Sequence, residues 1–241
     1  MKSQTIKSLV DWPPAVLKNW FKWLAVSYCR LFKSSKTFSF QGRDYPYFFH
    51  PYNLAWRNER AVEIPIARGF LSAHAGHEIL EVGNVLSHYL DVEYDILDKY
   101  EVSDGVINED ALYFNPGKKY ALIISISTLE HIGWDEYPLD PGKAMSVMMN
   151  LIGLLAPGGE LVATFPLGYN PGFDRLLEQK QIPFTEIFAL RRIRGRNEWA
   201  EADFESVRGT PYNRNRFRAD AIIVGLLRNG QVENKGGCNS G

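Results

Sequence analysis

Apolar positions along the chain fall into short continuous runs that alternate with segments of helical spacing. Runs of strand length occupy residues 78–82, 93–97, 120–126, 160–165, 185–192 and 219–228. Helical patterns follow several of these runs and predict helices over residues 85–90, 142–155 and 172–180. Continuous apolar runs are typical of parallel strands that are buried on both faces. The alternation therefore predicts an α/β fold with a Rossmann-like, doubly wound and mainly parallel sheet.

The pattern changes at both ends of this alternation. No long helical segment separates the runs at 185–192 and 219–228, so we expect an antiparallel last strand. Ahead of the first buried run, aromatic residues mixed with turn formers predict a strand or hairpin at 38–48 and a helix near 54–63. The Pro-Gly-Gly sequence at 157–159 predicts a turn.

The first 37 residues carry a separate amphipathic pattern. One face of a helix that begins after Pro13 and Pro14 would hold Leu17, Trp20, Phe21, Leu24, Tyr28, Leu31 and Phe32. Basic residues fall on the other face, and the segment has seven basic residues against one acid, Asp11. Two interpretations stay open. The helix lies in a membrane interface with aromatic and basic anchors, or it docks on the domain or on a protein partner.

Composition bounds the class of protein. Of the 241 residues, 45% are hydrophobic and 23% are charged, which is typical of a globular protein. We expect a helical extension at 1–37, one domain at 38–229 and a disordered Gly-rich tail at 230–241. The net charge of −1 gives no overall attraction to nucleic acid, so no nucleic-acid partner is expected.

Cysteine usage and hydropathy bear on the compartment. Cys29 and Cys238 lie far apart without a companion at metal-ligand spacing, so we expect neither a disulfide framework nor a metal site. The sequence contains no run of about 18 apolar residues and no secretory signal pattern. These features predict a cytoplasmic protein, which would be membrane-associated only through its N-terminal helix.

Polar residues follow the first two buried runs, where an open α/β sheet binds its ligands. Glu81, Gly83 and Asn84 follow the first run, and Asp98 follows the second. Gly83 would let the backbone turn sharply and approach a ligand closely. A carboxylate at the position of Asp98 can accept hydrogen bonds from ribose hydroxyls. Neither phosphate-binding glycine motif is present, so the pattern favours a nucleoside without phosphates.

Two further loops add candidates. Asp110 could meet an adenine amino group, and His131 follows the central apolar run, where a reaction centre would lie. Imidazole titrates near neutral pH, so His131 is a candidate general base. The alternative is that His131 only positions its loop.

Five segments in this order resemble one family. ILEVGN, YDILDKYE, INEDALYF, YALIISISTLEHIG and LLAPGGELVATFPLG are similar to the motifs of class I S-adenosylmethionine-dependent methyltransferases. The resemblance covers about residues 76 to 170, and LEHIG followed by a helix and LLxPGG is its most specific part. It implies S-adenosyl-L-methionine as the cofactor. The region at 185–228 fits the reversed last strands of that fold.

The resemblance also implies roles for individual residues. Glu81 would act through its loop toward the methionine end of the cofactor, Asp98 would bind the ribose, and Asp110 with Ala111 would contact the adenine. Residues near Ser127 to Leu129 would line the methionine side. The cofactor-binding set is Glu81, Gly83, Asn84, Asp98, Asp110, Ala111, Ser127 and Leu129.

Substrate contacts are expected from two stretches. Residues 50–60 concentrate polar and aromatic groups in a region that often forms a lid in this family, with Tyr52, Arg57 and Arg60 as the candidates. The alternative is that Arg60 pairs with a nearby glutamate, Glu63 or Glu81, and that the aromatic residues pack. Tyr169 and Asn170 would border the substrate pocket, or they would only form a turn.

Three functional hypotheses follow. The resemblance implies methyl transfer to oxygen or nitrogen of a small molecule, for which a sugar or glycan precursor is one candidate class. The second hypothesis is a binding or scaffolding domain without turnover, because Val85 and Ser87 stand where the first loop of the family usually has glycines. A nicotinamide-dependent oxidoreductase is disfavoured because the dinucleotide fingerprint is absent.

Overall fold

The computed structural model describes residues 15–193, 197–213 and 218–230. The predicted helix start at Pro13 and Pro14 and, beyond Gly230, the predicted disordered tail lie outside these ranges.

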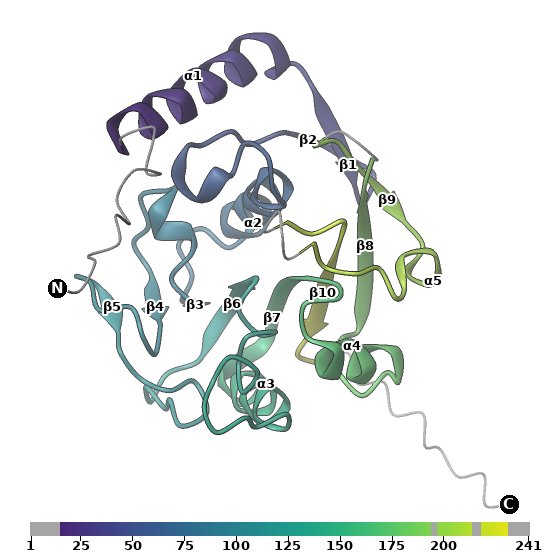
Figure 1. The fold of residues 1–241 in the computed structure, drawn as a ribbon. Helices are drawn as coiled ribbons and strands as arrows, with labels where there is room; N and C mark the ends of the chain where they lie inside the picture. Colours follow the sequence, from purple (N-terminus) through teal and green to yellow (C-terminus); the bar gives the residue numbers. More distant parts are fainter. Residues whose placement is uncertain (1–14, 194–196, 214–217, 231–241) are drawn as a thin grey trace, which may run out of the picture.

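An eight-stranded sheet forms the centre of the molecule (Figure 1). Its strand order is β5-β4-β3-β6-β7-β10-β8-β9. The strands are β3 (Ile79–Val82), β4 (Asp95–Leu97), β5 (Val106–Ile107), β6 (Tyr120–Ile126), β7 (Leu155–Pro166), β8 (Glu186–Arg192), β9 (Trp199–Ala202) and β10 (Ala221–Arg228). The five strands from β5 to β7 in this order are parallel to one another. Strand β10 lies between β7 and β8 and runs antiparallel to both. This arrangement confirms the predicted doubly wound, mainly parallel sheet with an antiparallel last strand.

Helices cover both faces of this sheet (Figure 1). Successive side chains of a strand point to opposite faces. Ile123 of β6 therefore packs in the core cluster that includes α3 (Lys143–Leu154) and α4 (Pro171–Glu178), whereas Ile124 packs in the cluster that includes α2 (Arg60–Ala73). Apart from Ser125, whose hydroxyl donates to the carbonyl of Val82 at 3.1 Å, β6 contributes hydrophobic side chains to both faces, which explains why its sequence is an almost continuous apolar run.

The helix expected near 54–63 is wrong. A 3-10 turn, η1 (Tyr52–Leu54), occupies that region, and α2 begins only at Arg60 and continues through Pro65. Proline has no N–H for the carbonyl four residues earlier, which is that of Ala61. The backbone N–H of Phe48 donates to this carbonyl at 2.9 Å, so the helix passes through Pro65 without an unpaired buried acceptor.

Two other predictions need correction, and two strands were not predicted. The helix expected at 85–90 is a single 3-10 turn, η2 (Leu86–His88). Residues 157–159 form an irregular part of β7, where the register with β6 shifts, instead of a turn before the strand. The short edge strands β5 and β9 were not predicted, because their few residues carry no extended apolar pattern.

The N-terminal segment lies against this core from outside. Helix α1 (Ala15–Lys33) is followed by the predicted hairpin, β1 (Thr37–Phe40) with β2 (Arg43–Pro46). In Figure 1, α1 lies on the side of α2, away from the sheet. Val26, Cys29 and Arg30 contact the body, so the helix does not dock through the face that the apolar pattern favours.

Candidate functional site

A cavity of about 470 Å³ opens at the carboxyl ends of β3, β4 and β6. This is the edge at which open α/β sheets bind ligands, and the volume suits a small molecule. The lining residues come from the loops after successive strands: Val82, Gly83, Leu97, Asp98, Lys99, Tyr100, Glu109, Asp110, Ala111, Thr128, His131, Ile132, Asp135 and Glu136.

Gly83 allows two loops to meet at the cavity wall. Its φ is +87°, and a Cβ at this position would lie 2.2 Å from Oγ1 of Thr128. Any side chain would therefore clash, in a backbone conformation that already favours glycine. The Gly83 N–H donates to the carbonyl of Leu97 at 2.8 Å, which ties the first loop to the end of β4.

Glu81 supports the first loop from behind and does not line the cavity. Its buried carboxylate accepts hydrogen bonds at Oε1 from the N–H groups of Val85 (2.9 Å) and Leu86 (2.7 Å). Oε2 accepts from the hydroxyl of Tyr94 at 3.1 Å. Burial raises the pKa of Glu81 to about 7, although these hydrogen bonds favour the ionised form. The Glu81 carboxylate thus accepts hydrogen bonds from two N–H groups at the start of a 3-10 turn that covers Leu86–His88.

Asp98 lies on the cavity wall with most of its acceptor capacity used. Oδ1 accepts from the N–H groups of Tyr100 and Glu101, both at 2.8 Å, and Oδ2 accepts from the N–H of Asn84 at 3.0 Å. A carboxylate offers about four acceptor sites, so about one remains for a ligand hydroxyl. The Asn84 side chain turns from the cavity and donates to Oε1 of Glu101 at 2.8 Å.

Asp110 belongs to a network of ion pairs at the other side of the cavity. Nζ of Lys143 lies 2.7 Å from Asp110 and 2.6 Å from Glu136, and Nζ of Lys99 lies 3.0 Å and 3.2 Å from the same two carboxylates. Burial opposes ionisation of Asp110, but hydrogen bonds from Lys143, the Leu112 N–H and Lys99 lower its pKa to about 2. Ala111 follows directly and also lines the cavity.

His131 meets a carboxylate and an aromatic ring at the cavity wall. Its Nδ1 lies 2.5 Å from Oδ2 of Asp135, and the Tyr169 hydroxyl donates to the same oxygen at 2.6 Å. The rings of His131 and Tyr169 are 4.4 Å apart between centroids. Because an ionised carboxylate only accepts, Nδ1 carries a proton, and in the neutral imidazole the lone pair is then on Nε2. The arrangement suits proton abstraction at Nε2.

Ser127 and Leu129 point away from the cavity, and the residue between them lines it. The Ser127 hydroxyl donates to Oε1 of Glu63 at 2.7 Å, and Leu129 is buried in the core. Thr128 takes the position at the wall. The prediction therefore named the loop that lines the cavity, but of its side chains it is Thr128 that lies at the wall.

A buried cluster of charged residues lies next to this loop. Arg60 pairs with Glu63, which also accepts from Thr164 Oγ1 at 2.7 Å. This is the alternative in which Arg60 pairs within the protein, and Arg60 does not line the cavity. Neither carboxylate oxygen of Glu130 has a hydrogen bond among the described residues, and Nε2 of His131 lies 3.7 Å away. Burial raises the pKa of Glu130 well above its ordinary value, which favours its neutral form.

The other predicted substrate residues occupy different places. The exposed ring of Tyr52 stacks on His88 with centroids 4.5 Å apart, and the guanidinium of Arg57 lies 5.6 Å from the ring centre of Trp56. Asn170 is the N-cap of α4, where its Oδ1 accepts from the N–H groups of Gly172 and Phe173. Of the predicted substrate residues, Tyr169 meets the cavity wall, through its ring contact with His131 and its hydrogen bond to Asp135.

Several lining residues had no sequence signal. Lys99 follows Asp98 in sequence, and Glu136 and Asp135 follow His131, so their loops were identified but their roles were not. Lys143 reaches the site from the start of α3, 33 residues after Asp110. Contacts over such a separation depend on the fold and cannot be deduced from local spacing.

Neither a family model nor a curated protein matches the sequence. Solved structures with similar architecture include the N-methyltransferase NodS from Bradyrhizobium japonicum WM9 in complex with S-adenosyl-l-homocysteine. It is 15% identical, with a TM-score of 0.48, over 75% of this chain and 92% of that chain. The glycopeptide N-methyltransferase MtfA, complexed with sinefungin, is 13% identical, with a TM-score of 0.37, over 71% of this chain and 96% of that chain.

A third similar structure is the methyltransferase domain of a bacterial protein, CtHen1. It is 10% identical, with a TM-score of 0.41, over 68% of this chain and 96% of that chain. At these identities the likeness concerns the fold.

Proposed function

We propose that this protein is an S-adenosylmethionine-dependent methyltransferase that acts on oxygen or nitrogen of a small molecule. The observation that carries the proposal is the position of Gly83, Asp98 and the pair Asp110–Ala111. They line one cavity at the carboxyl edge of the parallel part of the sheet, which has the order β5-β4-β3-β6-β7. This position and the absence of a phosphate-binding motif suit a nucleoside cofactor without phosphates.

The chain's own residues fit this cofactor. The close approach of Gly83 to Thr128 leaves backbone, not side chain, at the wall of the first loop. Asp98 would hold the ribose, Asp110 and Ala111 the adenine, and Gly83 with Thr128 the methionine side. When bound, S-adenosylmethionine supplies an electrophilic methyl group. Val85 packs against the core, and the Ser87 hydroxyl donates to Oδ1 of Asn84. Although both residues stand where the family usually has glycines, neither lines the cavity.

His131 would take the proton of the acceptor at Nε2, with Asp135 as a positioning residue that holds Nδ1–H. Tyr169 shares the Asp135 carboxylate and would border the acceptor. Methyl transfer itself requires mainly alignment of the acceptor with the methyl group. We propose a small molecule with a hydroxyl or amino group as the acceptor, and a sugar or glycan precursor is the first class to screen.

The test is calorimetric titration of the full chain with S-adenosylmethionine and S-adenosylhomocysteine. We expect saturable binding that Asp98→Ala abolishes and that Asp104→Ala leaves unchanged, since Asp104 is exposed and does not line the cavity. Binding that persists in Asp98→Ala would move the ribose away from Asp98. No binding in the unmodified protein, with circular dichroism showing an intact fold, would favour the scaffolding hypothesis.

A further inference from the structure

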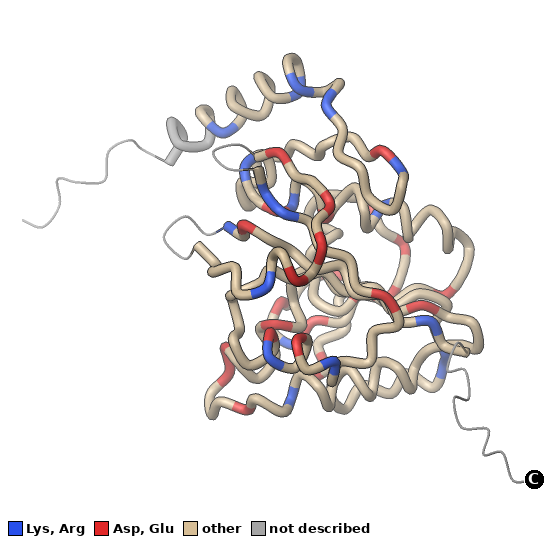
Figure 2. Tube along the Cα trace, turned by 90° about the vertical axis from the view of Figure 1, so that its right-hand side faces the viewer, with Lys and Arg blue, Asp and Glu red and all other residues tan. Residues whose placement is uncertain are grey.

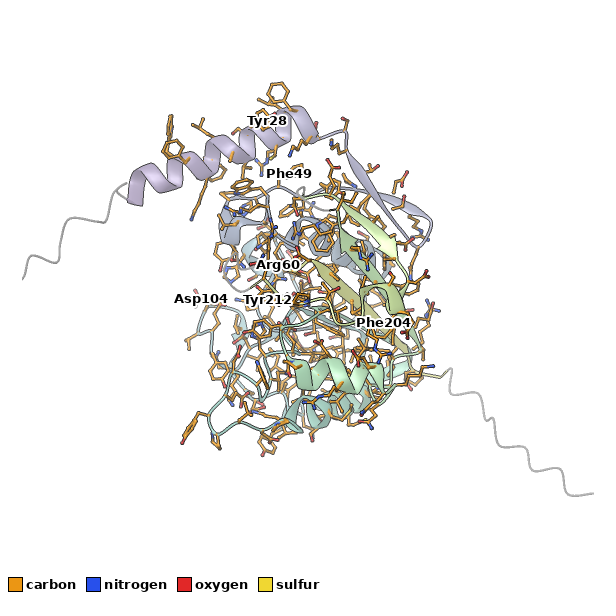
Figure 3. The ribbon with its side chains drawn as sticks, turned by 45° about the vertical axis from the view of Figure 1, so that its right-hand side comes forward. Tyr28, Phe49, Arg60, Asp104, Phe204 and Tyr212 are labelled. Atoms are coloured by element: carbon orange, nitrogen blue, oxygen red, sulfur yellow. The ribbon has the colours of Figure 1, made fainter. Side chains whose placement is uncertain are left out.

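Helix α1 presents an apolar face to solvent. Its exposed apolar residues are Trp20, Phe21, Trp23, Leu24, Tyr28, Leu31 and Phe32, and Leu31 and Phe32 are 75% and 69% exposed. Apart from Trp23, they follow helical spacing and form one continuous stripe, which we call the outer stripe. Figure 3 shows Tyr28 on the outer side of α1 and Phe49 beneath the helix. Single exposed apolar side chains are ordinary, but a continuous stripe marks a binding surface.

The opposite face of α1 is already occupied by the protein. Val26 and Cys29 are buried and pack with Phe49. The guanidinium of Arg30 donates from Nε and Nη2 to the carbonyl of Phe49, at 3.3 Å and 3.1 Å. These contacts fix the rotation of the helix, so the outer stripe cannot turn inward without breaking them.

A second cavity, of about 670 Å³, lies between α1 and the body. Its lining includes four cationic residues, Lys33, Lys36, Arg57 and Arg218, and one acid, Glu198, which pairs with Lys36. We call it the basic cleft. Buried Nε1 of Trp56 and buried Nε of Arg218 make no hydrogen bond among the described residues, and Nε of Arg218 lies 3.9 Å from Oδ1 of Asp220. The cleft therefore has an excess of positive charge and of hydrogen-bond donors, which suits an anion.

We propose that the outer stripe and the basic cleft together dock the protein on the surface of an anionic phospholipid bilayer. Trp, Phe and Leu side chains of a basic amphipathic helix enter the boundary between headgroups and acyl chains. Lys33 and Arg57 then face the phosphates of the neighbouring headgroups. This proposal is independent of the methyl-transfer activity.

Charge favours a membrane over a protein as the occupant. Helix α1 carries four basic residues and no acidic residue. Figure 2 shows blue segments and no red segment along it. The whole chain has a net charge of −1, so this basic region is local. Within the described ranges no helix has the length and hydropathy to span a bilayer. The helix would thus lie along the surface, and anionic lipid is the partner that matches both its charge and its aromatic residues.

The experiment is co-sedimentation of the full chain with vesicles of phosphatidylcholine alone or with added phosphatidylglycerol. We expect binding to the anionic vesicles that weakens at least tenfold in Leu31→Ser/Phe32→Ser. The matched control is Val102→Ser/Tyr113→Ser, because these side chains are 85% and 79% exposed at loops far from α1 in sequence. Lys33→Gln/Arg57→Gln should lose only the part of binding that depends on anionic lipid and on low salt.

A second measurement needs no variant. Brominated acyl chains should quench the fluorescence of Trp20, which lies in the outer stripe and is 55% exposed. Absence of vesicle binding and of quenching in the unmodified protein would overturn the proposal. A self-associated species that Leu31→Ser/Phe32→Ser dissociates, without vesicle binding, would also overturn it and assign the outer stripe to a second copy of the chain.

Discussion

His131 and Asp135 are four residues apart in the chain, and their side chains meet at the cavity wall. Nδ1 of His131 lies 2.5 Å from Oδ2 of Asp135. The carboxylate fixes the orientation of the imidazole and leaves Nε2 as the basic atom. Under the proposed function, this pair makes the histidine of the LEHIG segment a positioned base.

We predict that His131→Asn lowers turnover by about 10²–10⁴ once an acceptor is found, because a general base typically contributes that much. Asp135→Asn should lower it less, since the base remains and only its orientation is lost. Formation of S-adenosylhomocysteine measures the rate, and calorimetry should show unchanged cofactor binding. His77→Asn is the control, because His77 is exposed and distant from the cavity lining. Full turnover in His131→Asn would reduce His131 to a loop-positioning residue.

Gly83 and Gly105 offer a matched pair of substitutions. Both have positive φ, +87° and +80°, but a Cβ at Gly83 would clash with Thr128, whereas nothing lies within 4 Å at Gly105. Gly105→Ala should cost about 1 kcal/mol, from the backbone conformation alone. Gly83→Ala should cost more in the free energy of unfolding and weaken cofactor binding. Urea denaturation gives the first quantity and calorimetry the second.

A rescue variant sharpens this comparison. Thr128→Ala removes the two side-chain atoms that the new Cβ would meet most closely, so it should recover part of the loss in Gly83→Ala but none in Gly105→Ala. Equal costs at both glycines would contradict the close contact between the two loops.

The fold was accessible from the sequence where burial is uniform. The run at 120–126 coincides with β6 because a strand buried on both faces favours apolar residues at nearly every position, and its one buried hydroxyl, that of Ser125, is hydrogen-bonded. The helix expected at 54–63 was wrong, because α2 begins only at Arg60 and continues through Pro65, a residue that locally disfavours a helix. The hydrogen bond from Phe48 that compensates for it comes from a different segment. Local propensity carries no information about such a distant partner.

The candidate site divides in the same way. Gly83 and Asp98 follow strands directly, so the topology places them on the cavity wall. In the next loop, Ser127, Thr128 and Leu129 point in different directions, and only the backbone conformation decides which of them faces the cavity. A shift of one position along the chain would turn a different side chain toward it. The sequence alone did not determine that direction.

Glu81 should make stability depend on pH. Burial raises its pKa from 4.5 to about 7, so the folded protein binds more protons than the unfolded chain between these values. The stabilising contribution is fully present below pH 4.5 and is lost as pH rises through 7. The difference corresponds to about 3 kcal/mol at most. Glu81→Gln keeps an acceptor for the loop and removes the titration, so its free energy of unfolding should fall less from pH 5 to pH 8.

Urea denaturation at both pH values checks this difference, with Glu205→Gln as the control, since Glu205 has a side chain that is 77% exposed. Other buried acids titrate equally in both proteins, so the comparison isolates Glu81. An identical pH dependence in Glu81→Gln and the unmodified protein would show that Glu81 is ionised throughout.

Two Arg–Glu ion pairs among the described residues join side chains three positions apart. One pair is buried and the other is exposed to solvent. Arg60 and Glu63 are buried, with side chains 10% and 0% exposed, whereas Glu205 and Arg208 are 77% and 51% exposed. Glu63→Gln keeps an oxygen for Ser127 and Thr164 but removes the charge beside Arg60. A buried cation that loses its partner costs about 3–5 kcal/mol. Glu205→Gln should change stability by less than about 1 kcal/mol, because water screens that pair.

The same pair of variants tests whether Arg60 binds substrate. If Arg60 serves the fold, Glu63→Gln should lower the free energy of unfolding in urea while the remaining folded protein binds S-adenosylmethionine with unchanged affinity. A small loss of stability with a large loss of turnover would instead assign Arg60 to the acceptor, because its charge would then be used by the substrate and not by Glu63.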